Sequence, residues 1–206
     1  MRRYAVAHLD NLDSFPVAHG LEWHPIRRRF GIRSFGVNAY TAEKPGDWVV
    51  EEHKEGSGHE ELYLVVRGRA RFTLDGEERD APAGTIVFLP DASVPRVALA
   101  EEDGTAVLAV GGWPDRAFEP SGWEWAFEAY GRASHGDLEG GLGVMRKALE
   151  ETGEEPAALY HLACLETRAG LHDEALAHLR RAIELYPDIE ERASGDEDLA
   201  PIVGSL

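Results

Sequence analysis

Short apolar segments separated by turn signals fill the first half of the chain. Residues 62–68 and 85–90 are nearly continuous apolar runs, as in strands buried on both faces, whereas apolar and polar residues alternate over 69–74. Clusters of Gly, Pro, Asp and Glu punctuate these segments at 44–47, 55–58, 74–78, 81–84, 90–95 and 101–104. Regular short strands with such turns predict a β-sandwich or β-barrel.

The hydrophobic period changes from two to about 3.6 across residues 111–123, which are rich in glycine and proline. Asp137 and Asp173 stand where helix N-caps belong, Gly170 where a C-cap belongs, and Pro187 just past a helix end. Residues 196–203 predict a short capping helix. The longer helices predicted before it are 124–133, 137–151, 156–170 and 173–187.

The helical half carries a spacing typical of a tetratricopeptide repeat (TPR). Small residues in such a repeat let two antiparallel helices approach closely, and large ones fill the seam. A 34-residue unit that starts at Pro156 places its apolar residues on the repeat's positions: Leu159, Leu162, Ala163, Gly170, Ala175, Leu179, Ala182 and Pro187.

The preceding unit, 123–153, matches the repeat less well. Trp125 and Met145 fit, but Gly141 and Gly143 loosen its second helix. Repeats usually need about three units to stand alone, so we expect this TPR-like module to pack against the β domain.

Charge and cysteine content narrow the class of protein. The chain of 206 residues has 38 acidic and 21 basic residues, a formal charge of -17, which disfavours nucleic acid and anionic membranes as partners. Cys164 is the only cysteine, so an intrachain disulfide is excluded. No segment approaches the roughly 18 apolar residues of a membrane span, and we expect a cytoplasmic protein.

One run in the β half resembles a known family. Glu61 is followed by six residues and then Gly68, and further on Gly84 is followed by Pro90. These spacings resemble the two motifs of the cupin superfamily over about residues 30–113. The resemblance implies a mainly β, jelly-roll-like cupin barrel at 30–113, with an N-terminal extension at 1–29, a linker at 114–122 and the TPR-like module at 123–206.

Many cupins bind iron, manganese, nickel or zinc through two histidines and a glutamate of the first motif and a histidine of the second. Counted from Glu61, the two histidine positions fall at Glu55 and Ser57, and the second-motif position falls at Pro95 or Arg96. Of the four ligands that the resemblance implies, only Glu61 is present.

The residues themselves leave a displaced metal site open. Side chains two apart share one face of a strand, so His59, Glu61 and Tyr63 should point together into the barrel, where His53 could approach them. Two imidazoles and a carboxylate suit one divalent transition metal. The alternative gives His59 a hydrogen bond to Glu61, leaves His53 exposed, and makes Tyr63 a packing residue with a satisfied hydroxyl.

Arg96 offers a site without a metal. A guanidinium in the place of a ligating histidine could pair with Glu61 or hold a small carboxylate or phosphate. The predicted ligand-binding residues are therefore His59, Glu61, Tyr63 and Arg96. The alternative for Arg96 is a solvated position at the rim.

Three functions follow from these features. The first is a cupin that binds a small molecule without the usual metal, fused to a TPR-like module for packing or protein contact. The second is a metal-dependent enzyme, an oxygenase or isomerase, with His59 and Glu61 as ligands and His53 or Glu55 completing the set. The third is a structural protein that binds a partner through its helices. Whether a reaction is catalysed stays open. Residues 24–40 could form a basic rim over the barrel mouth, or a strand that covers an edge or joins a dimer interface. Cupins often dimerise through N-terminal strands, so the resemblance favours the second interpretation and implies a homodimer through the barrel.

Overall fold

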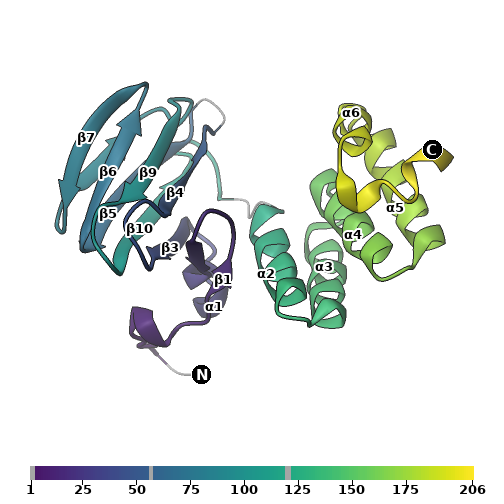
Figure 1. The fold of residues 1–206 in the computed structure, drawn as a ribbon, viewed down its shortest axis with the longest axis horizontal. Coiled ribbons are helices and arrows are strands. Elements are labelled where there is room, and N and C mark those ends of the chain that lie inside the picture. Colours follow the sequence, from purple (N-terminus) through teal and green to yellow (C-terminus); the bar gives the residue numbers. More distant parts are fainter. Residues whose placement is uncertain (1–2, 56–57, 119–121) are drawn as a thin grey trace. The chain divides into compact units, whose positions relative to one another are not determined.

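The computed structural model describes residues 3–55, 58–118 and 122–206 (Figure 1). It divides into two compact units, residues 1–120, called here the β unit, and residues 121–206, called the helical unit. The prediction of strands followed by helices is confirmed. Among the described helices, none combines the length and apolar composition needed to cross a bilayer.

Two antiparallel sheets make up the β unit. The six-stranded sheet has the order β1 (Phe15–Pro16), β2 (Leu21–His24), β3 (Gly36–Ala42), β10 (Thr105–Gly112), β5 (Glu60–Arg67) and β8 (Ile86–Leu89). The four-stranded sheet has the order β4 (Trp48–His53), β9 (Arg96–Ala100), β6 (Arg69–Leu74) and β7 (Glu77–Pro82). The short helices η1 (Leu9–Asn11) and α1 (Ile26–Phe30) lie before β3.

The predicted jelly-roll-like β-barrel is found in part: the strands form two antiparallel sheets, and neither sheet closes on itself. Four strands are left as edges, namely β1, β8, β4 and β7. A proline in β1 and charged residues along β4 and β7 suit edge positions better than a closing strand pair. Strands β1 and β2 also extend the sheet into the segment expected to be an N-terminal extension.

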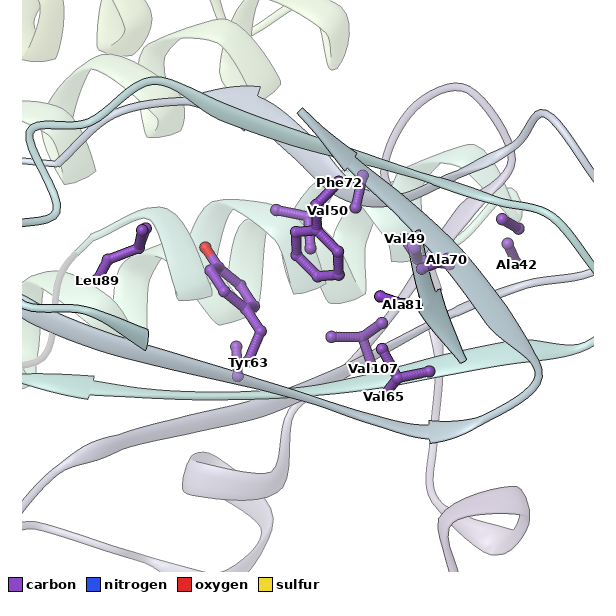
Figure 2. Packing of buried hydrophobic residues seen from close by; sticks show 13 residues of the cluster. Ala42, Val49, Val50, Tyr63, Val65, Ala70, Phe72, Ala81, Leu89 and Val107 are labelled. Carbon is purple, nitrogen blue, oxygen red and sulfur yellow. The ribbon is translucent and has the colours of Figure 1, made fainter. Parts of the chain in front are cut away.

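The apolar core of the β unit lies between the two sheets. Tyr63, Val65 and Val107 come from the six-stranded sheet, and Val50 and Phe72 come from the four-stranded one. Figure 2 shows these side chains gathered into one cluster, with Tyr63 carrying the only hydroxyl among its labelled residues. Strand β5 lies in the interior of a sheet with one face on this core, but Val66 on its other face is exposed, so the predicted burial of the run 62–68 on both faces is wrong. The run 85–90 is not buried on both faces either, since Ile86 and Phe88 of β8 are exposed.

Steric constraints explain why a glycine, Gly68, stands seven residues after Glu61. It joins β5 to β6 with a positive φ of 71°, and a Cβ there would lie 2.5 Å from the Thr105 Oγ1 atom and 3.0 Å from the Thr105 Cα atom. Only glycine accommodates both the conformation and the close approach. The spacing recognised in the sequence is therefore a requirement of the turn.

Four helices predicted in the second half are confirmed, and a shorter one was missed. The missed helix is α6 (Ile189–Ser194), and the predicted capping helix is two short 3₁₀ turns, η2 (Glu197–Leu199) and η3 (Val203–Ser205). The confirmed helices are α2 (Trp123–Ser134), α3 (Leu138–Thr152), α4 (Pro156–Arg168) and α5 (His172–Leu185).

The predicted caps differ in outcome. Asp137 caps α3, since its side chain accepts a hydrogen bond from the Gly140 amide at 2.9 Å. The prediction for Asp173 is wrong, because α5 begins two residues earlier, after Leu171, and Asp173 lies in its first turn. An acidic residue there still favours the helix through the helix dipole.

Small residues line the helix contacts of the helical unit. Ala129, Ala163, Ala175 and Ala182 are all fully buried in its two apolar clusters. Alanine at such positions allows the closely packed helices that the repeat spacing predicts. The assignment as a TPR stays a prediction.

Gly141 does not loosen α3, contrary to the expectation from its low helix propensity. A Cβ at this position would lie 2.6 Å from the Ala129 carbonyl oxygen of α2, so the glycine permits the close approach of α2 and α3. Gly143 differs, because a Cβ there would meet nothing within 4 Å.

Alanine substitutions should separate these two glycines. Gly141→Ala should destabilise the protein by about 1–3 kcal/mol, because the methyl group collides with backbone. Gly143→Ala should instead stabilise it by up to ~1 kcal/mol through helix propensity alone. Urea unfolding followed by circular dichroism at 222 nm measures both, and equal effects of the same sign would contradict this account of the packing.

A buried carboxylate joins α4 to α5. Glu166 is buried, and its Oε2 atom lies 2.7 Å from the His178 Nδ1 atom. The hydrogen bond that His178 donates to Glu166 raises the pKa of His178. Burial and Arg146 oppose this rise, and Glu174 reinforces it. The pair is therefore strongest with His178 protonated.

The stability of the helical unit should accordingly fall as the pH rises through the raised pKa of His178. Because the pKa in the unfolded chain is about 6.5, the contribution is complete below that pH and is lost above it. Unfolding free energies of the full chain measured between pH 5.5 and 9 should show this loss. His178→Gln should remove this part of the pH dependence, and an unchanged profile in the variant would refute the assignment.

Candidate functional site

Two strands from different sheets bring three of the four predicted ligand-binding residues together. Strand β5 carries Glu61 and Tyr63, two residues apart and on the same face, and Tyr63 belongs to the core between the sheets. Strand β9 of the other sheet begins at Arg96, which is paired in register with His53 of β4. Alternation along β5 and the start of β9 thus direct three polar side chains toward one point.

Glu61, Tyr63 and Arg96 form a hydrogen-bonded cluster, called here the Glu61–Tyr63–Arg96 network. The Tyr63 hydroxyl donates to the Glu61 Oε2 atom at 2.6 Å, and the Arg96 Nε atom donates to the Tyr63 hydroxyl at 3.1 Å. The Arg96 Nη2 atom forms an ion pair with the same carboxylate oxygen, and the Nη1 atom donates to the Ala92 carbonyl at 2.7 Å. Each guanidinium nitrogen is thus bound within the protein.

Burial sets the electrostatics of the network. The Arg96 side chain is 0% exposed, and that of Glu61 is 11% exposed. Burial raises the pKa of Tyr63 well above its usual range, and the neighbouring Glu61 adds to this effect. Burial works against the charged form of Arg96, but Tyr63 and Glu61 outweigh it and raise the pKa of Arg96. The network is therefore an ion pair with a neutral phenol between its members.

The predicted metal ligands do not come together. Within residues 3–55, 58–118 and 122–206, no three His, Cys, Asp or Glu side chains are arranged to hold a metal ion. The His53 Nδ1 atom lies 2.8 Å from the backbone carbonyl of Glu51, and Glu61 is bound to Arg96. A cation on Glu61 would face this fixed guanidinium, so the residues present do not fit a metal. Ser57 lies outside the described residues.

His59 occupies a separate aromatic niche. Its ring packs against Trp113 with centroids 4.7 Å apart, and a Cβ on Gly111 would lie 2.8 Å from the His59 Cε1 atom. The side chain is buried, with 8% of the residue exposed, and its Nδ1 atom has no hydrogen-bond partner among the described residues. Among the described residues His59 forms no hydrogen bond to Glu61, contrary to one of the expectations, although it lies directly before β5 and only two residues from Glu61.

Glu51 is a member of the site that the sequence analysis missed. It is half-buried on β4, two residues before His53. Burial and the neighbouring Glu55 carboxylate raise the pKa of Glu51 above its usual value. His53 and Arg96 oppose this rise but do not cancel it. Alternation along β4 is the signal that could have found it, because residues two apart share a face.

Removal of Arg96 should be costly. Arg96→Met would leave the Glu61 carboxylate buried without its ion partner, and such a loss typically destabilises a protein by about 3–5 kcal/mol. Chemical denaturation of the full chain measures the change. The double variant Arg96→Met, Glu61→Gln should recover part of it, since no unpaired charge then remains.

Arg69 provides a matched control, because it forms an ion pair with Asp80 on the surface of the same unit. Arg69→Met should change stability little, since solvent screens exposed pairs. An Arg96 variant as stable as this control would show that the network contributes nothing to the fold.

Comparison with known proteins gives structural likeness only. No protein-family model matches the chain, and no curated protein is significantly similar to it. Several similar solved structures are described as cupins. A sugar phosphate isomerase of the cupin superfamily from Silicibacter pomeroyi DSS-3 is 18% identical, with a TM-score of 0.43, over 52% of this chain and 74% of that one.

Two further solved structures are similar over the same share of the chain. KdgF from Halomonas sp. is 19% identical, with a TM-score of 0.40, over 52% of this chain and 90% of that one. A predicted oxalate decarboxylase from Thermotoga maritima is 17% identical, with a TM-score of 0.42, over 52% of this chain and 97% of that one.

Proposed function

We propose that the β unit binds a small organic molecule beside the Glu61–Tyr63–Arg96 network without using a metal ion. The observation that carries this proposal is the Nδ1 atom of His59, which is buried in its niche against Trp113 and has no hydrogen-bond partner among residues 3–55, 58–118 and 122–206. Buried polar atoms are normally hydrogen-bonded, and an exception requires an explanation. A ligand that supplies the missing partner of His59 is that explanation.

Arg96 acts in this proposal as a positioning residue. Its side chain has no exposed surface, and its nitrogens are bound to Glu61, Tyr63 and Ala92. An anion could reach the guanidinium only by displacing Glu61. Arg96 therefore holds Glu61 and Tyr63 in place, and the ligand contacts His59 and the partly exposed edge of Glu61.

The charge left around the network favours a neutral or cationic ligand. The negative charge of Glu55 raises the pKa of Glu51, so the two carboxylates lie near each other. The positive charge of Arg96, by contrast, is already balanced by Glu61. A molecule with hydroxyl or amino groups can donate hydrogen bonds to these carboxylates. A sugar or an amino sugar has this chemistry, and an anionic ligand would be repelled.

For the helical unit we propose a TPR-like module that serves packing or protein contact. The support is the 34-residue spacing from Pro156 together with the fully buried alanines at the helix contacts. A metal-dependent enzyme is the second candidate for the β unit, since a free imidazole nitrogen such as the His59 Nδ1 atom can also ligate a metal. That function requires Glu61 to leave Arg96.

Elemental analysis separates the two candidates for the β unit. Full-length protein purified without an affinity metal column should contain no stoichiometric iron, manganese, nickel or zinc. The double variant His59→Ala, Glu61→Ala should have the same content. A metal present near one equivalent in the native protein and lost in the variant would instead support the enzyme with a displaced ligand set.

Ligand binding can be tested with His59→Phe, which keeps a ring against Trp113 but removes both nitrogens. Glucose and glucosamine serve as probes, with fructose 6-phosphate and oxalate as anionic comparisons suggested by the names of the similar structures. We expect a neutral or cationic probe to raise the melting temperature of the native protein and not that of the variant. Equal shifts in both proteins, or none from any probe, would contradict the proposal.

A further inference from the structure

One of the four edge strands lacks the features that normally keep edges apart. Proline or charged side chains usually protect exposed strand edges from pairing with another chain. Strand β1 contains Pro16, β4 contains two glutamates, and β7 contains four charged residues. Strand β8 contains neither feature, and residues 81–90 around it include no charged side chain. This edge is open to a further strand.

The face next to this edge is also apolar and exposed. On β8 the outward side chains of Ile86 and Phe88 are 62% and 53% exposed, and Val66 of the adjacent β5 is likewise exposed. A groove of about 290 Å³ adjoins this surface at Phe88 and Leu62, and its far side is polar, with Glu60 and Glu61 among its lining residues. Exposed apolar patches of this kind mark sites of association.

We infer that a second copy of this chain pairs with the open edge, β8 against β8, in antiparallel orientation about a two-fold axis. The chain carries a formal charge of -17, so two copies repel each other wherever their acidic surfaces meet. The uncharged stretch 81–90 lets them approach. A two-fold contact also needs a surface that complements itself, which an edge strand provides through its own backbone groups.

The side-chain alternation of β8 limits the register of this pairing. Residues directly opposite each other in an antiparallel pair point to the same face of the sheet. The two-fold axis must therefore lie midway between one residue and the same residue of the second copy. An axis at Val87 places Ile86 of each copy opposite Phe88 of the other. The two-fold symmetry thus gives two equivalent contacts between an aliphatic and an aromatic side chain. An axis at Phe88 would place Ile86 opposite Pro90, which has no amide to donate.

Molar mass in solution tests the contact. Sedimentation equilibrium of the full chain should give about twice the chain mass of 22.7 kDa. The double variant Ile86→Lys, Phe88→Lys should be monomeric at the same concentration and keep its circular dichroism spectrum, because both side chains are exposed. Leu185→Lys, Tyr186→Lys is the matched control on exposed apolar residues of the helical unit, and it should remain dimeric.

Two results would overturn the inference. One is a native protein that is monomeric. The other is a lysine variant that remains dimeric. If that dimer is then lost when residues 3–8, with the exposed Tyr4 and Val6, are removed, the contact belongs to the N-terminal segment instead.

Cysteine cross-linking tests the register. A mixture of Ile86→Cys and Phe88→Cys proteins should form a disulfide-linked dimer under mild oxidation, and each protein alone should not. Identical positions 86 lie two residues apart along the paired strands, beyond the about 7 Å between Cα atoms that a disulfide spans. Cys164 is fully buried and stays out of the reaction. Equally efficient cross-linking of either protein alone would exclude the Val87 register.

Discussion

The ion pair between Arg96 and Glu61 connects the two sheets of the β unit. Arg96 comes from the four-stranded sheet and Glu61 from the six-stranded one, and Tyr63 is hydrogen-bonded to both. A charge without exposed surface requires a partner in close contact, so the two sheets must meet in the register that brings these residues together. His59 lies directly before β5, and its niche depends on the pairing of β5 with β10, which brings Gly111 and Trp113 beside it.

The local part of this arrangement could be predicted from the sequence. The spacing from Glu61 to Gly68 located β5 and its turn, and alternation placed Glu61 and Tyr63 on one face. Pairing of Arg96 with Glu61 was one of two options, since sequence alone does not determine whether an arginine at a strand start is buried or solvated. The sequence left a sandwich and a barrel open, because closure depends on which distant strands pair at the edges.

The helical unit, too, could be predicted from the sequence only in part. Periodicity predicted α2 to α5, but Asp173 and Gly141 were interpreted from local propensity alone. The carbonyl of Ala129 gives Gly141 its role, and that atom belongs to another helix. The partner of His59 illustrates the same point, because the ring packs on Trp113 and Gly111, more than fifty residues away in the chain. Contacts between distant segments decide such cases.

The positive charge beside Glu61 is supplied by a side chain of the protein itself, Arg96. A protein whose core charge is balanced by a bound ion gains stability only in proportion to the supply of that ion, by mass action. Here the balancing charge is covalently part of the chain, because Arg96 is always present at one equivalent. The charge balance of this buried pair therefore does not depend on the concentration of any free ion in the surroundings.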